Sequence, residues 1–116
     1  MSSNFIGVII KESLANQDVL EKVKILETKV DKANKWTLYT VEISPERAAK
    51  VASELSQCLE SAHSWYADFK NDDLHFIIFR NKIFRIGRKS QKEYTEAKNY
   101  GLAQGIPAHQ VNFKAK

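Results

Sequence analysis

The stretch LHFIIFRNKIFRIGRK (74–89), with Lys92 just after it, combines aromatic, aliphatic and basic residues and contains no acid before Glu93. Aromatic rings stack on bases and cations contact phosphates, so the composition suits nucleic acid or a phosphorylated ligand. The six cations here exceed the net charge of +4, so the positive excess is local. The candidate anion- or nucleic-acid-binding residues are Phe76, Arg80, Lys82, Arg85, Arg88, Lys89 and Ser90.

Ser90 belongs to this set because it precedes a predicted helix, whose first N–H groups favour an anion. The simpler interpretation is that Ser90 caps the helix and that the neighbouring cations are solvated. Phe76 and Ile78 likewise have a structural interpretation, in which another element or a second subunit covers them and the arginines extend into solvent.

Other reactive residues predict no catalytic or metal site and no cofactor. His63, His75 and His109 lack metal-ligand spacing, and Cys58 lies on the apolar stripe of a predicted helix, where a thiol is inert. Asp68, Asp72 and Asp73 are interpreted as turn residues. Trp36, Trp65 and Tyr66 are assigned to an aromatic core, and a pocket at one end of the sheet is the alternative.

Hydrophobic periodicity predicts the elements that position these residues. We expect strands at 5–11, 24–30, 36–43 and 64–70, a hairpin at 74–89, a short helix at 16–23, long helices over 44–62 and from Ser90 to Gly105, and a terminal strand or strap at 111–113. A hairpin turn at Asn81 and Lys82 would pair Phe79 with Phe84. It would put Phe79 on a core face and Phe76 on a mixed face.

This order predicts an α+β fold, specifically a ferredoxin-like sandwich: an antiparallel sheet with two main helices packed on one face. The 116 residues suit a single domain, 1–116. The single cysteine and an N-terminus without signal-peptide features predict a cytoplasmic protein with no membrane association.

The segments WYADF (65–69) and YGLAQGIPAHQ (100–110), together with the hairpin, resemble a family of small prokaryotic α+β proteins, a domain of unknown function. The resemblance starts at FIGVIIKES and covers most of the chain. It implies a compact stand-alone domain and transfers no activity, cofactor or site residue.

Three functional hypotheses follow. The leading one is a non-enzymatic cytosolic binding or interaction module that forms a homodimer through its sheet face. The alternative is binding of nucleic acid or a phosphorylated ligand by residues 74–92. The third is an enzyme with a small pocket near the aspartates or histidines.

Overall fold

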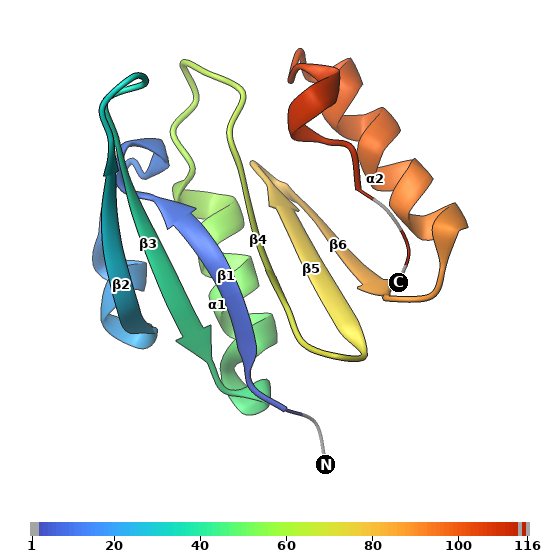
Figure 1. The fold of residues 1–116 in the computed structure, drawn as a ribbon, viewed down its shortest axis with the longest axis horizontal. Helices are drawn as coiled ribbons and strands as arrows, with labels where there is room; N and C mark the ends of the chain where they lie inside the picture. The colour runs from blue at the N-terminus through green and yellow to red at the C-terminus, as the bar shows by residue number, and fades with distance from the viewer. Residues whose placement is uncertain (1–2, 114, 116) are drawn as a thin grey trace.

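The computed structural model describes residues 3–113 and 115, which form a six-stranded antiparallel sheet and two α-helices (Figure 1). The strands are β1 (Phe5–Ile10), β2 (Lys24–Asp31), β3 (Trp36–Ile43), β4 (Tyr66–Lys70), β5 (Leu74–Phe79) and β6 (Lys82–Gly87). The helices are α1 (Pro45–Cys58) and α2 (Gln91–Ala103), with short 3₁₀ turns η1 (Lys11–Ser13), η2 (Asp18–Lys22) and η3 (Ala108–Gln110). The α+β class is therefore confirmed. None of these helices is long and apolar enough to cross a bilayer.

The strand order β2-β3-β1-β4-β5-β6 differs from the predicted ferredoxin-like order. β1 pairs antiparallel with both β3 and β4, so β3 and β4 are parallel, and α1 connects them across β1. This is one split β-α-β unit, half of the ferredoxin-like arrangement. The remaining strands extend the sheet on both sides as hairpins, and β2 and β6 become its edges.

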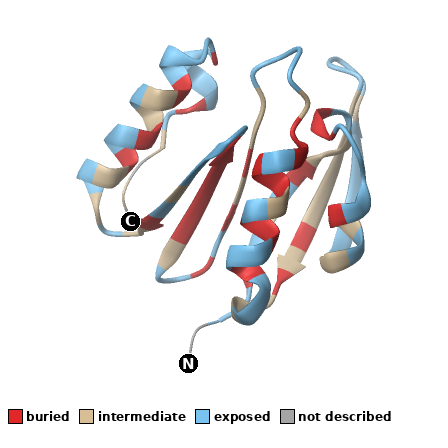
Figure 2. Cartoon of the chain, turned by 180° about the vertical axis from the view of Figure 1, so that it is seen from behind, coloured by how far each residue is buried: buried red, intermediate tan, exposed pale blue. Residues whose placement is uncertain are grey.

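The two helices lie on opposite faces of the sheet, so the prediction that both pack on one face was wrong. α1 covers one face of the sheet. Phe76 and Ile78 lie on that face, together with core residues of β1, β3 and β4. The other face, with Ile77 and Phe79, is covered by α2 and by the C-terminal segment that follows it, which contributes Ile106, Val111 and Phe113. Because β5 is apolar on both sides, it needs a cover on each, and Figure 2 shows its buried residues in red.

Several local predictions are confirmed. The buried stripe of α1 includes Val51 and Leu55, and Cys58 is buried at its end. Beyond α2, Gly105 has a φ of 90°, its N–H donates to the Leu102 carbonyl, and the Ile106 N–H donates to the Gly101 carbonyl. This is a Schellman ending sealed by buried Ile106. Residues 111–113 form a strap over the sheet and no strand.

The β5–β6 register is two residues away from the prediction. Phe79 pairs with Lys82 because the turn residues are Arg80 and Asn81. Asn81 takes the positive φ of 61°, and its N–H donates to the Ser56 carbonyl at the buried side of α1. A shift of two residues leaves every side chain on its predicted face, so only the pairing was wrong.

Candidate functional site

Phe76 lies in the core and cannot stack on a base. It is 4% exposed, and its ring centroid lies 5.4 Å from Phe5 and 5.1 Å from Phe69. α1 covers this face, which was predicted to be mixed and for which both an accessible and a covered state were considered. The structural interpretation of Phe76 and Ile78 is therefore correct, although the cover is a helix of the same chain.

The predicted cations do not form one surface. Arg85 is exposed on the α1 side of β6, whereas Lys82 lies on the α2 side with its ammonium 5.2 Å from the centre of the Phe84 ring. Arg80 occupies the turn, and Lys89 is exposed beyond the other end of β6. What these four residues share is the edge strand and its two ends, where charges also oppose edge-to-edge aggregation.

Ser90 caps α2 as predicted: its hydroxyl accepts the Glu93 N–H at 3.3 Å. The Glu93 carboxylate accepts the Gly87 N–H at 3.4 Å instead of completing a reciprocal capping box. The negative charge of Glu93 lies at the start of the helix, in the position that an anionic ligand would otherwise occupy. The geometry thus favours the capping interpretation of Ser90.

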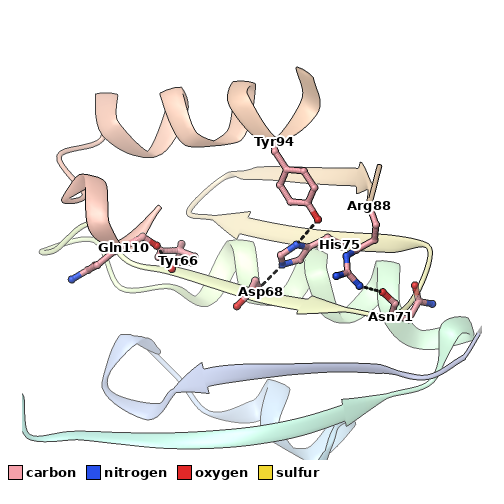
Figure 3. A network of polar contacts seen from close by, with 7 residues as sticks. All are labelled: Tyr66, Asp68, Asn71, His75, Arg88, Tyr94 and Gln110. Carbon is pink, nitrogen blue, oxygen red and sulfur yellow. Dashed lines mark hydrogen bonds and ion pairs between the residues drawn. The ribbon is translucent and has the colours of Figure 1, made fainter. Parts of the chain in front are cut away.

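Arg88 turns inward, away from the other cations. Its Nη1 donates to the Asn71 carbonyl at 2.6 Å, and the guanidinium lies beside Tyr94. Among the described residues, buried Arg88 Nε has no hydrogen-bond partner. This side chain therefore belongs to an internal polar cluster between β5 and α2 (Figure 3).

The centre of that cluster is a chain of hydrogen bonds from Tyr94 through His75 to Asp68. The Tyr94 hydroxyl lies 3.0 Å from His75 Nδ1, and His75 Nε2 lies 2.7 Å from Asp68 Oδ2. Tyr94 is 1% exposed and the His75 side chain 7%, whereas the Asp68 side chain is 32% exposed. The carboxylate is therefore the end of the chain that solvent and ligands can reach.

A neutral His75 with its proton on Nε2 satisfies both contacts. Nε2–H then donates to Asp68, and Nδ1 accepts a hydrogen bond from the Tyr94 hydroxyl, so the carboxylate carries the only charge of the pair. Burial raises the pKa of Tyr94, although neighbouring Arg88 acts in the opposite direction. Tyr94 thus stays protonated and able to donate.

The Asp68 side chain lines a cleft of about 330 Å³. The cleft lies on the α2 side of the sheet, over the part of that face that α2 leaves uncovered. Its apolar lining comes from Val8, Ile10 and Leu38, its aromatic lining from Trp36, Trp65 and Tyr66, and its polar lining from Ser64, Asp68, His109 and Gln110. We call this the tryptophan cleft, because both tryptophans of the chain line it. A second cleft of about 300 Å³ adjoins it, shares Tyr66 and Asp68, and reaches His75, Arg88 and Tyr94.

Hydrogen bonds hold the walls of the tryptophan cleft in place. Trp65 Nε1–H donates to the Glu60 carboxylate at 2.7 Å, and its ring meets Trp36 edge to face at 5.4 Å. The Tyr66 hydroxyl donates to the Gln110 carbonyl, which attaches the C-terminal segment to β4. Burial and nearby Asp68 raise the pKa of Tyr66 to about 12.

The arrangement presents one oriented carboxylate beside an aromatic surface. Such a carboxylate can accept a hydrogen bond, hold a cation or take up a proton. The Ser64 hydroxyl donates to the Gln104 carbonyl, and burial raises the pKa of the Cys58 thiol, so neither is activated as a nucleophile. In the described part of the chain no three potential ligands cluster around a metal position.

The Asp68–His75 pair was missed from sequence, since Asp68 was assigned to the turn with Asp72 and Asp73. β-strand alternation could have predicted the pair. Asp68 pairs with Ile77, so Asp68, Ile77 and His75 lie on one face of the β4–β5 hairpin. The pocket alternative for Trp36, Trp65 and Tyr66 agrees with the cleft that they line.

No protein-family model, curated protein or solved structure matches this chain. The resemblance to a family of small prokaryotic α+β proteins therefore stays a prediction.

Proposed function

We propose that the protein is a binding module and that its ligand occupies the tryptophan cleft. The observation that supports this most is the incomplete cover of the second sheet face. α2 and the C-terminal segment cover β5 and β6, whereas apolar side chains on β1 and β3 remain accessible beside the cleft. Cytoplasmic location remains part of the proposal and is supported by the one free cysteine, Cys58.

The floor of the cleft gives a ligand apolar surface to bury. Val8 is 40% exposed, and Ile10 and Leu38 are partly exposed, although all three belong to strands whose other face is core. Removing such surface from water is worth about 25 cal/mol per Å², so a small apolar group gains affinity here. The walls are held by hydrogen bonds before any ligand arrives, which lowers the ordering cost of binding.

Methyl NMR spectra recorded as a library of small aromatic and aliphatic compounds is added to the protein would test this proposal. Binding should shift the methyl signals of Val8, Ile10 and Leu38. Val30 and Leu102 serve as controls, since they are 64% and 40% exposed and line no part of the cleft. Equal shifts at the control methyls, or no shift in the cleft with any compound, would overturn the proposal.

A second candidate function is binding of an anionic ligand or nucleic acid along β6. It is supported by the exposed cations Arg80, Lys82, Arg85 and Lys89 on that edge, and it no longer includes Phe76 or Arg88. Mixed-sequence RNA and DNA should then bind at low salt and dissociate as salt rises. The R85E variant should weaken binding more than K50E, a charge reversal at an exposed position of α1. No binding at low salt would exclude this candidate.

A further inference from the structure

We infer that the tryptophan cleft takes an organic cation, namely an ammonium or amidinium group carried on an apolar or aromatic body. This inference rests on the proposed function and adds the charge of the ligand. The cleft combines an apolar floor, two indole rings and one carboxylate within one open space. Each part selects a different property of the ligand.

Asp68 supplies the negative charge. Its Oδ2 accepts from His75, and no hydrogen bond joins its Oδ1 to any described residue. Within the described chain no lysine or arginine lines this cleft; Lys70 and Arg88 belong to the adjoining one, and Arg88 donates to the Asn71 carbonyl. A ligand cation can therefore pair with Asp68 without displacing a cation of the protein.

The hydrogen-bond chain behind Asp68 fixes where that charge points. His75 is held between Asp68 and Tyr94, and Tyr94 is buried in the contact between α2 and the sheet. A carboxylate oriented in this way loses little side-chain entropy when a ligand binds. His75 and Tyr94 are thus positioning residues for Asp68.

The two indoles favour the same class of ligand. A cation above an indole face is attracted by the ring quadrupole, and Trp is the best of the three aromatic residues for this contact. Trp36 and Trp65 meet at an interplanar angle of 66°, so their rings present surfaces in two directions. An alkylammonium or amidinium group can contact an indole and Asp68 together, and its apolar body can lie on Val8 and Leu38.

Three probes of one shape and different charge test the inference: phenethylammonium, 2-phenylethanol and 3-phenylpropionate. Both tryptophans of the chain line the cleft, so their fluorescence and indole N–H signals report on this site. We expect phenethylammonium to bind at least about tenfold more tightly than the other two, the effect of one hydrogen bond to a charged group. D68N should remove that preference, because the amide can still accept from His75 but carries no charge.

E96Q is the matched control, since it removes an acid from an exposed position of α2 away from the cleft. Its preference for phenethylammonium should equal that of the unmodified protein. Equal or tighter binding of the alcohol or the propionate overturns the inference and leaves the proposed function standing. Binding of none of the three probes, with unchanged indole signals, overturns the inference, and the compound library tested on the methyl signals then decides the proposed function. The probe series on the unmodified protein decides the matter even if D68N fails to fold.

Discussion

Gly7 lies so close to β4 that a Cβ atom on it would come within 2.0 Å of the Asp68 carbonyl oxygen. It would also lie 2.6 Å from the Cα atom of Phe69. These are backbone contacts, so no side-chain rotation relieves them. The absence of a side chain at position 7 is therefore what lets β1 and β4 pair directly beside the carboxylate of the candidate site.

We expect G7A to destabilise the protein by about 1–3 kcal/mol, the usual cost of overpacking a core. Thermal unfolding followed by circular dichroism measures this loss. G87A is the control, because the nearest atom to a Cβ there is Glu93 Oε1 at 3.7 Å, an ordinary contact. Equal melting temperatures for G7A and the unmodified protein would contradict the close approach of β4.

Y94F should also reduce stability, because it removes the hydroxyl that donates to His75 Nδ1. A buried acceptor left without its donor costs about 1–3 kcal/mol. Y100F is the matched control: Tyr100 lies on the same helix and packs against Phe79, but its hydroxyl has no hydrogen bond to a described residue. Urea unfolding of the two variants compares them directly. If Y100F loses as much stability as Y94F, the hydrogen bond from Tyr94 to His75 contributes nothing to the free energy of unfolding.

F76A tests whether Phe76 is a core residue or a stacking surface. We expect a loss of about 3–5 kcal/mol, typical of a buried Phe replaced by Ala. F84A should cost less, because Phe84 is only partly buried against the other core. An F76A variant with unchanged stability but weakened RNA binding would restore the interpretation as a nucleic-acid surface.

These residues also indicate how far the sequence alone could predict the structure. Alternation along β5 correctly separated Phe76 from Phe79, because the pattern survives a register error of two residues. It did not reveal which helix covers which side, since both faces of β5 are apolar. The contact between Asp68 and His75 could have been predicted by working out the residue pairing of the β4–β5 hairpin. The contact between Tyr94 and His75 could not, because it depends on where α2 docks on the sheet.

The orientation of Trp65 should depend on pH through Glu60. Hydrogen bonds from His63, from the Ala62 N–H and from the Trp65 indole lower the pKa of Glu60 to about 2 from the ordinary 4.5. A depressed folded-state pKa means that the stabilisation is complete above pH 4.5 and is lost as the pH falls through about 2. The indole N–H signal of Trp65 should shift across this window. In E60Q, where residue 60 no longer titrates, that part of the shift should vanish; identical profiles would contradict the role of Glu60.

Self-association is the last expectation, and β2 is the strand best suited to it. β2 is a sheet edge, and Ile25, Leu26 and Val30 on it are 42%, 48% and 64% exposed. Antiparallel pairing of two β2 strands about Thr28 would place Glu27 of one copy opposite Lys29 of the other. Glu27 and Lys29 lie on the same face, since they pair with Thr40 and Leu38 of β3. Opposite charges at such positions stabilise a pair of strands.

We therefore expect a dimer at high protein concentration, detectable by size-exclusion chromatography with light scattering. E27K alone and K29E alone should each weaken it, because like charges would then face each other across the pair. The double variant E27K/K29E should restore it, since the two charges only exchange places. A chain that stays monomeric at hundreds of micromolar would contradict this mode of association. Dimers unaffected by either single reversal would place the contact elsewhere, for instance on the open face around Ile6 and Val8.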